Sequence, residues 1–384
     1  MRDGWVDTTF GEAFNIQQGK TLAINKLKGG KYPVYGANGV VGYFDEYNFD
    51  FPVTGLGCRG SCGTIYHINE KAFLANNVMA IWEKDSSRIE SRFIPLALTN
   101  VDLVTSGAIS GQVQPQITKQ GLEPVPIKIP PLPEQKRIVD LISSVDSYIE
   151  ALIEQLESAK RSRNAVLHEL LTAGGDDWVE TTLGKVCEFV NGDRGKNYPS
   201  AKFRQSHGIP FINAGHLDNG VVNFDSMDFI SEEVFKKLGS GKIQSGDTLF
   251  CLRGSVGKFA NVEDLKEGAI ASSLVIMRPK SGITKDFLMH YLDSEMCSSE
   301  IKQSLTGAVQ PNLSANNLKN FKISLPNIKS QIEIDELLGE FRFSISSMGV
   351  LIESTKDLRA GLLSDLLSGK HEIPASYDRV MGAA

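Results

Sequence analysis

Residues 133–174 read PEQKRIVDLISSVDSYIEALIEQLESAKRSRNAVLHELLTAG, and the rest of the chain is arranged around this stretch. It begins with Pro133 and Glu134, a proline and a carboxylate that suit the first turn of a helix. Gly174 follows the last helix-favouring residues and predicts where the helix ends. A helix from Glu134 to Thr172 would be about 58 Å long at ~1.5 Å per residue, far longer than an average helix. Such a length predicts a spacer.

Small or apolar side chains recur along this helix at alternating steps of three and four residues. This spacing is typical of a coiled-coil seam, in which one face of a helix packs along a partner helix. The pattern is interrupted at Arg163. The seam consists of Ile142, Val145, Ile149, Leu152, Leu156, Ala159, Val166 and Leu170.

The same seam returns 196 positions later, and its interruption returns with it at Arg359. Ser330, with Glu333 three residues later, predicts a capping box at the start of this second helix, and Gly369 predicts its end. One such helix alone could equally be an ordinary amphipathic core helix, but two matching copies favour an antiparallel pair. The second seam consists of Leu338, Phe341, Ile345, Met348, Ile352, Thr355, Leu362 and Leu366.

Two copies of one domain precede the two helices. The segments WVDTTFG from Trp5 and WVETTLG from Trp178 open them, 173 positions apart. The turn sequence Arg-Gly-Ser-x-Gly occurs at Arg59 and, 194 positions later, at Arg253. A Gly-x-x-Gln-Pro segment, for which we favour a structural turn, repeats at an offset of 196. The growing offset predicts about 23 additional residues in the second copy, between Gly184 and Arg253 and around the polar run 191–198.

Short apolar runs between Gly, Asn and Asp turns predict that each domain mixes strands with helices. The expected fold is α+β, with two repeated mixed α/β domains separated by two long antiparallel helices that form a coiled coil, in a pseudo-twofold circular arrangement. Strands are expected at 64–68, 78–82, 127–130, 248–251, 274–277 and 323–326, and a helix at 285–293. The expected parts are 1–132 for the first domain, 133–174 for the central helix, 175–326 for the second domain, 327–371 for the distal helix and 372–384 for a C-terminal tail.

Composition and charge narrow the class of protein. The chain has 41% hydrophobic residues, and neither an apolar leader nor a run of 18 apolar residues occurs, which predicts a cytoplasmic protein. Five cysteines without C-x-x-C pairs indicate reduced thiols. The net charge of −6 lies on the helical segments and the tail, so the two domains are neutral overall and their basic clusters are free to face a polyanion. The simpler alternative is that the acidic residues only solvate the helices.

No catalytic pattern stands out in the sequence. The phosphate-binding P-loop, the H-x-x-x-H zinc spacing and the Pro-Pro-Tyr/Phe site of DNA methyltransferases are not found. The domains instead carry polar, glycine-supported loops whose side chains suit phosphates and base edges. Solvated loops have a similar composition, and the glycine-flanked Arg59 and Arg253 could mark tight strand turns. The candidate DNA-binding residues are Lys26, Lys28, Lys31, Tyr32, Asn38, Arg59, Ser61, Arg194, Lys196, Asn197, Tyr198, Arg204, Arg253, Ser255 and Lys258.

The repeated domain opening, the Arg-Gly-Ser-x-Gly turn and above all IPPLPEQKRI at 129–138 resemble the specificity subunit of a type I restriction-modification system. The resemblance implies two target recognition domains, each of which reads half of a bipartite site in double-stranded DNA. It also implies that the helices recruit two modification subunits, and it makes Glu134, Gln135, Arg163 and Arg359 candidate contacts with partner subunits. The second junction, LPNIKSQ at 325–331, departs from the pattern of the first.

The same resemblance implies that this chain is not an enzyme by itself and binds no cofactor. S-adenosylmethionine would be used by the modification subunits, and ATP with Mg²⁺ by the restriction and translocation subunits. Two alternatives from other classes remain: part of a DNA methyltransferase whose catalytic region lies elsewhere, or an assembly scaffold that does not touch DNA. Methylation by the purified chain would favour the first, and a lack of salt-dependent binding to duplex DNA would favour the second.

Overall fold

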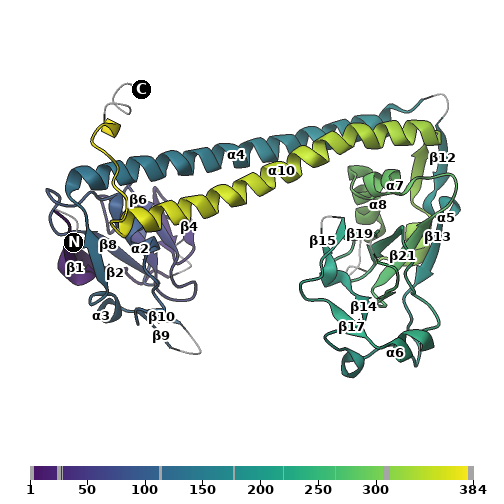
Figure 1. Cartoon of the computed structure of the whole chain (residues 1–384), viewed down its shortest axis with the longest axis horizontal. Coiled ribbons are helices and arrows are strands. Elements are labelled where there is room, and N and C mark those ends of the chain that lie inside the picture. Colours follow the sequence, from purple (N-terminus) through teal and green to yellow (C-terminus); the bar gives the residue numbers. More distant parts are fainter. Residues whose placement is uncertain are drawn as a thin grey trace. The chain divides into compact units, whose positions relative to one another are not determined.

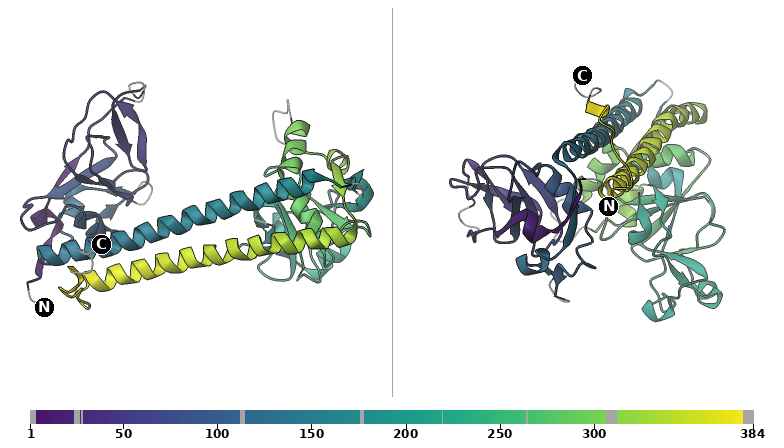
Figure 2. Two further views of the ribbon diagram at one scale, coloured as in Figure 1. Left: turned by 90° about the horizontal axis from the view of Figure 1, so that it is seen from above. Right: turned by 60° about the vertical axis from the view of Figure 1, so that its left-hand side comes forward.

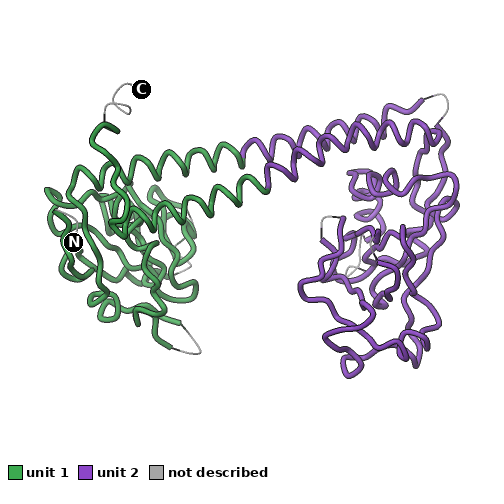
Figure 3. Tube along the Cα trace, viewed as in Figure 1, with its two compact units in different colours: residues 1–153, 350–384 green, residues 154–349 purple. Residues whose placement is uncertain are grey.

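The computed structural model describes residues 4–23, 27, 29–111, 115–175, 178–218, 220–263, 265–305 and 312–378. The chain divides into two compact units (Figure 3). Unit 1 consists of residues 1–153 and 350–384, and unit 2 consists of residues 154–349. Each unit therefore contains one mixed α/β domain and part of each long helix (Figure 1).

The domain of unit 1 consists of short strands and helices: β1 (Val6–Thr9), α1 (Phe10–Ala13), β2 (Phe14–Gln18), β3 (Tyr32–Gly36), β4 (Gly39–Phe44), β5 (Val53–Gly57), β6 (Ile65–Ile68), β7 (Phe73–Leu74), β8 (Val78–Glu83), α2 (Phe93–Thr99), β9 (Ile109–Ser110), β10 (Gln116–Ile117), α3 (Lys119–Leu122) and β11 (Pro126–Ile129). Its main sheet is antiparallel, in the order β2-β8-β5-β6. A second sheet, β4-β3-β7, contains the parallel pair β3 and β7. β1 pairs with β11 and thereby joins the start of the domain to its end.

The domain of unit 2 contains β12 (Val179–Thr182), α5 (Leu183–Val186), β13 (Cys187–Asn191), η2 (Ala201–Phe203), β14 (Ile209–Ile212), η3 (Ala214–His216), β15 (Leu217–Asp218), β16 (Val221–Val222), β17 (Asp228–Ile230), α6 (Glu232–Lys237), β18 (Asp247–Cys251), β19 (Phe259–Val262), β20 (Ala269–Ile270), β21 (Leu274–Pro279), α7 (Lys285–Leu292), α8 (Glu295–Leu305), α9 (Ala315–Lys319) and β22 (Lys322–Leu325). Its sheets repeat those of unit 1: β13-β21-β18-β19 matches the main sheet, β17-β14-β20 matches the second, and β12 pairs with β22. The predicted strands and the predicted helix at 285–293 are therefore confirmed, and the duplication extends to the sheet topology.

Twenty-one of the 23 additional residues of the second domain lie between Gly184 and Arg253, as predicted, but most of them lie outside the polar run 191–198. Corresponding residues are 173 apart at Gly192, 177 apart in β14, 194 apart in β18 and 196 apart in β20. Only four additional residues therefore belong to the segment that contains the polar run. Seventeen lie between β14 and β18, in the region that forms β15, β16 and α6, and two lie after β19. The repeated motifs only bracket this region, so they could not place the additional residues within it.

The two long helices are α4 (Leu132–Ala173) and α10 (Ile328–Leu367), in close agreement with the predicted bounds. α4 ends before Gly174, which has a φ of 61° that favours glycine. The predicted cap of α10 is wrong, because Ser330 lies inside the helix. The Asn327 side chain accepts a hydrogen bond from the Ser330 N–H at 3.0 Å, and asparagine caps helices as well as serine does. No helix among the described residues is long and apolar enough to cross a membrane.

α4 and α10 run side by side and antiparallel in each unit (Figures 1 and 2). In unit 1, apolar residues from 138–142 of α4 share a cluster with residues from 363–367 of α10. In unit 2, residues from 167–171 of α4 share the domain core with residues from 334–338 of α10. Every predicted seam position is buried or half-buried. The predicted antiparallel pair is therefore confirmed within each unit.

A fully buried glutamine ties the domain of unit 1 to the start of α4. The Gln135 amide nitrogen donates to the carbonyl oxygens of Arg88 and Pro130, each at 2.8 Å. Its Oε1 accepts a hydrogen bond from the Glu90 N–H at 2.9 Å. The side chain has no exposed surface, so it joins two parts of the same unit.

Gln331 repeats this arrangement in unit 2. Its amide nitrogen donates to the carbonyl oxygens of Gly282 at 3.1 Å and Pro326 at 2.9 Å, and its Oε1 accepts from the Thr284 N–H at 2.8 Å. The matching bonds give a residue-by-residue correspondence between the units. Residues correspond at an offset of 196 along the long helices and of 194 along the segments that contain α2 and α7.

The segment after α10 folds back onto the start of α4 in unit 1. Ile373 is 6% exposed and belongs to the same apolar cluster as Ile138. The Arg137 guanidinium donates to both carboxylate oxygens of Asp378, each at 2.8 Å. Residues 350–378 therefore complete a unit that begins at the other end of the chain.

Candidate nucleic-acid interface

The Arg-Gly-Ser-x-Gly turns follow a central strand of each main sheet. In unit 2 the turn follows β18, and Gly254 and Gly257 have φ values of 80° and 94°, which favour glycine. The corresponding glycines of unit 1 have φ values of 78° and 93°. The two turns therefore share one backbone form, and both leave their arginines, Arg59 and Arg253, exposed.

Each turn arginine is held by a segment that comes later in the chain. Arg253 forms an antiparallel bridge with Asn312, and its Nε donates to the Asn312 Oδ1 at 3.2 Å. Arg59 forms the corresponding bridge with Gln116. No carboxylate among the described residues forms an ion pair with Arg253, so its charge is available to an anionic ligand.

Arg253 lies in an open polar groove of unit 2 with a volume of about 670 Å³. The groove also contains Arg194, so the structure brings together two predicted residues that stand 59 positions apart. Most of the residues that line the groove are polar, and their guanidinium, amide and hydroxyl groups are of the kinds that bind phosphates and base edges. The polar lining residues are Asn191, Asp193, Arg194, Ser240, Arg253, Asn312, Ser314 and Asn316.

A glycine allows the loop that carries Arg194 to reach the groove. A Cβ on Gly192 would lie 2.5 Å from the carbonyl oxygen of Ala271, closer than the two atoms can approach. Gly19 meets the carbonyl oxygen of Ala75 in the same way in unit 1, at 2.2 Å. The close backbone approach is thus common to both domains, and the residues that follow it differ.

The corresponding place in unit 1 carries different side chains on the same frame. Lys20 and Thr21 stand where unit 2 has Asp193 and Arg194, and Lys20 forms a backbone bridge with Ala75. Gln116 replaces Asn312. A ligand at this place would therefore meet different hydrogen-bonding groups in the two units.

Sequence reasoning missed several groove residues. Asn191 belongs to the polar run noted in the sequence but is not among the candidate residues. Asn312 follows Gln310 and Pro311, a segment whose sequence favours a structural turn. Ser240 lies in a loop, Ser314 caps α9 and Asn316 lies in its first turn, and none of the three belongs to a sequence motif. Only the fold brings these residues beside Arg253.

The other predicted residues of unit 1 lie mainly at the surface. Asn38 is exposed in the turn between β3 and β4, and Ser61 is exposed in the arginine turn. Lys31 is exposed, and its Nζ lies 5.6 Å from the centroid of the half-buried Tyr32 ring. Lys26 and Lys28 lie outside the described residues.

Three predicted residues of unit 2 make contacts within their own domain. The Asn197 amide nitrogen donates to the Lys237 carbonyl at 2.8 Å, and Tyr198 packs edge-on against Phe211. Arg204 forms an ion pair with Asp228 at 2.8 Å. These contacts give the three side chains a structural role, and a role in binding DNA stays a prediction. The remaining predicted residues, Lys196, Ser255 and Lys258, are exposed.

The four predicted partner contacts are all engaged within this chain. Glu134 accepts a hydrogen bond from the Trp5 indole at 3.1 Å. Gln135 is the fully buried glutamine whose hydrogen bonds tie the domain of unit 1 to α4. Arg163 pairs with Asp293, and Arg359 pairs with Asp146. Gln135 has no exposed surface to offer a partner in this conformation, because its amide fastens the domain to the helix.

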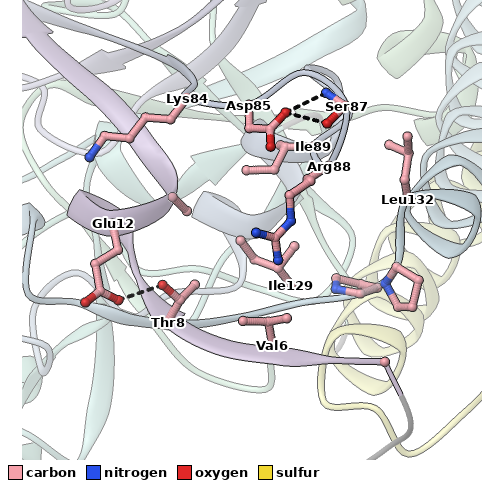
Figure 4. Close-up of a pocket in the computed structure, with 14 residues that line it drawn as sticks. Val6, Thr8, Glu12, Lys84, Asp85, Ser87, Arg88, Ile89, Ile129 and Leu132 are labelled. Atoms are coloured by element: carbon pink, nitrogen blue, oxygen red, sulfur yellow. Dashed lines mark hydrogen bonds between the residues drawn. The ribbon is translucent and has the colours of Figure 1, made fainter.

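A second cavity, of about 330 Å³, lies in unit 1 where the domain meets α4 (Figure 4). Its rim carries the charged side chains of Glu12, Lys84, Asp85 and Arg88. A hydrogen bond from the Thr8 hydroxyl lowers the pKa of Glu12, and one from the Ser87 hydroxyl lowers the pKa of Asp85. Both carboxylates are held ionised near neutral pH, so neither suits the role of a general acid, which needs a raised pKa.

Comparison with known families explains the duplication. A family model described as the type I restriction modification DNA specificity domain matches residues 2–159 and, again, residues 175–346. The chain belongs to this family. Each half of the chain is therefore one DNA specificity domain followed by helix, as the resemblance in the sequence implied.

Specificity subunits are similar to the chain over most of its length. The type I restriction enzyme MjaVIII specificity subunit of Methanocaldococcus jannaschii is 23% identical over 331 residues, which cover 81% of this chain and 76% of that protein. The EcoBI specificity subunit of Escherichia coli is 25% identical over 382 residues, which cover 87% of this chain and 78% of that protein.

Solved structures show the same fold at low sequence identity. The type I restriction-modification S subunit from M. genitalium has a TM-score of 0.56 and 18% identity, over 94% of this chain and 96% of that one. A chain from a study of complex assembly and conformational transition of the type I R-M system has a TM-score of 0.64 and 16% identity, over 96% of this chain and 98% of that one. Both solved chains thus share the fold of this chain over nearly its whole length.

Proposed function

We propose that this specificity subunit reads a bipartite target in double-stranded DNA, one half with each domain, and directs partner subunits that carry the catalysis. The observation that carries the proposal is the polar groove of unit 2, in which Arg194 and Arg253 meet amide and hydroxyl groups. Arg side chains recognise guanine edges and phosphates, and Asn side chains recognise adenine edges. The groove therefore offers both charge attraction and base discrimination.

The two half-sites are expected to differ in sequence. Unit 1 repeats the backbone of the groove but presents Lys20, Thr21 and Gln116 at positions where unit 2 presents Asp193, Arg194 and Asn312. Seventeen additional residues between β14 and β18 further distinguish the second domain. A common frame with different side chains suits two independent readers.

The long helices are the proposed binding surface for modification subunits. Several large apolar side chains of α10 face solvent, among them Phe343 at 75% exposure, Val350 at 66% and Leu358 at 68%. Within unit 1, Leu351 at 44% exposure stands seven residues before Leu358, so these two side chains lie on one face of the helix. Helices of a partner could cover such a face.

We infer that two modification subunits bind here, that S-adenosylmethionine, ATP and Mg²⁺ belong to the partners, and that the complex works in the cytoplasm, where the DNA is.

Binding to DNA tests the proposal directly. Sequencing of modified bases in the source genome would supply the target, and the full chain would be titrated with that duplex and with a scrambled one, at several salt concentrations. We expect preference for the target and affinity that falls steeply with salt. The double substitution Arg194→Ala with Arg253→Ala should abolish the preference in one half-site. The matched control, Lys236→Ala with Lys237→Ala on α6, removes the same charge outside the groove.

A labelled-methyl assay separates the proposal from a hidden methyltransferase. The purified chain, given S-adenosylmethionine and the target duplex, should transfer no methyl group until a modification subunit is added. Methyl transfer by the chain alone would contradict the non-catalytic assignment. Equal binding to target and scrambled duplexes, with or without a modification subunit, would remove the reading function.

A further inference from the structure

The correspondence between the units exposes a charge reversal in the long helices. At an offset of 196, Arg163 of α4 corresponds to Arg359 of α10, and Asp146 of α4 corresponds to Arg342 of α10. In unit 1 Arg359 pairs with Asp146, and its Nη2 lies 2.9 Å from the Asp146 Oδ2. The same positions in unit 2 hold two arginines, which repel each other.

Unit 2 has two acidic residues that compensate for this reversal. Asp335 stands where unit 1 has the buried Val139, and its Oδ1 accepts a hydrogen bond from the Arg342 guanidinium at 2.8 Å. Asp293, at the end of α7, stands where unit 1 has Thr99, and it pairs with Arg163. Each arginine thus has its own carboxylate, and one of these carboxylates belongs to the recognition domain.

A buried histidine completes the cluster. His290 of α7 is 3% exposed, and its Nε2 lies 2.9 Å from the Asp335 Oδ1. It corresponds to Leu96 of α2, which belongs to an apolar cluster with Val139 in unit 1. An apolar contact between domain and helix in unit 1 has therefore become a histidine–aspartate contact in unit 2.

We propose that Arg163, His290, Asp293, Asp335 and Arg342, here termed the joint cluster, position the second recognition domain on both long helices and make its docking depend on pH. The proposal rests on the function proposed above. His290 of α7 contacts α10 through Asp335, and Asp293, which directly follows α7, contacts α4 through Arg163. In unit 1, α2 packs through apolar side chains instead, such as Phe93 and Ala97. These are positioning residues, since none lines the groove that holds Arg253.

The charge balance of the joint cluster explains the expected pH dependence. Two aspartates balance two arginines, so the cluster is neutral while the imidazole is neutral. Burial lowers the pKa of His290, the Asp335 hydrogen bond opposes this, and Arg342 and Arg163 lower the pKa further. A histidine released from the joint would titrate near its ordinary pKa of about 6.5 and would take up a proton more readily. Docking is therefore complete above that pH and weakens as the pH falls through it.

Hydrogen exchange on the free, full chain tests the joint, with α2 as the internal reference for α7. Between pH 7.5 and pH 5.8, after correction for intrinsic exchange rates, we expect protection of the α7 amides to fall several-fold more than that of the α2 amides. His290→Gln keeps a hydrogen-bond donor without a titrating group and should remove the excess loss. The triple substitution His290→Leu, Asp335→Val and Arg342→Asp installs the unit 1 residues and should do the same. Equal pH responses of α7 and α2 in the unchanged chain, or a full response in His290→Gln, would overturn the joint.

Selection from a random duplex library by the chain with its modification subunit tests the consequence for reading. At pH 7.5 both halves of the enriched site should be defined. At pH 5.8 one half should lose base preference in the unchanged chain and keep it in His290→Gln. Exchange that loosens α7 while both halves stay defined would contradict the positioning role. No enriched site at pH 7.5 would instead count against the proposed function, and the exchange result would stand independently.

Discussion

Gln135 and Gln331 each satisfy three backbone groups where a domain meets its helix. Replacing Gln331 by Leu fills a similar volume but leaves those groups without partners, which costs ~1–3 kcal/mol in comparable cases. We expect the free energy of unfolding to fall by about that amount in urea titrations of the full chain. Gln303→Leu makes the same chemical change at an exposed position of α8 and should leave the midpoint nearly unchanged. Equal effects of the two substitutions would show that the hydrogen bonds of Gln331 do not stabilise the contact between domain and helix.

Substitution of Arg253 tests DNA recognition with little effect on folding, because its side chain is exposed at a turn. Arg253→Ala should weaken binding by about 1–3 kcal/mol and relax base preference in one half-site if the guanidinium contacts a guanine edge. If the guanidinium contacts phosphate alone, the substitution should weaken binding to all duplexes evenly and reduce the slope of affinity against salt concentration by about one. Titrations against duplexes altered in one half at a time distinguish the two. Unchanged binding to every duplex would reduce this turn to a structural one.

Single residues were the least predictable part of this molecule. Arg59 and Arg253 could be found because flanking glycines mark their turns, and a turn is a local property. The groove could not be found, since it depends on loops near 191, 240, 253 and 314 that meet only in the folded sheet. Tyr198 and Arg204 looked like ligands because sequence does not reveal that Phe211 and Asp228 lie beside them.

Whole elements were predicted much more closely than single residues. α4 and α10 were predictable because the spacing of their apolar residues repeats over many helical turns. The interruption of the seam at Arg163 also recurs, at Arg359. Antiparallel pairing followed from the order of domain and helix. The main error was to centre the additional residues of the second domain on the polar run 191–198, although their bounds at Gly184 and Arg253 were nearly right. Short strands such as β15 and β16 carry too few residues to give a pattern.

Helix length is the element-scale property most open to experiment. Four residues inserted after Leu156 would lengthen α4 by ~6 Å while roughly keeping its face. If the helices set the distance between the half-sites, the preferred gap should grow by one or two base pairs, at ~3.4 Å per base pair, and the bases read should stay the same. Mapping the sites methylated by the reconstituted mutant complex measures both quantities. An unchanged gap at full activity would show that the helices do not set this distance.

For the whole molecule, the duplication predicts that the domains are exchangeable parts. Residues 11–110 replaced by the equivalent segment of another specificity subunit should change one half of the recognised site and leave the other half intact. The reason is that β1 pairs with β11, so the strands that flank the exchanged segment on its two sides lie next to each other and stay in place. Sequencing of methylated sites from the chimera would decide the matter, and a change in both halves would mean that the domains read jointly. Replacing the segment by its own sequence through the same cloning junctions provides the control.

The return of residues 350–378 to the start of α4 has a consequence for synthesis on the ribosome. Unit 2 is one continuous stretch and can fold as soon as it emerges, whereas unit 1 lacks Leu363, Leu366 and Ile373 until the last part of the chain is made. At 5–20 residues per second, the interval between residue 153 and residue 350 lasts about 10–40 s. During that interval the apolar face around Ile138 and Ile142 lacks the side chains of α10 and Ile373 that complete its cover. The half that is made first is thus the half that matures last, and a nascent chain that stalls before α10 is complete would present that face to chaperones.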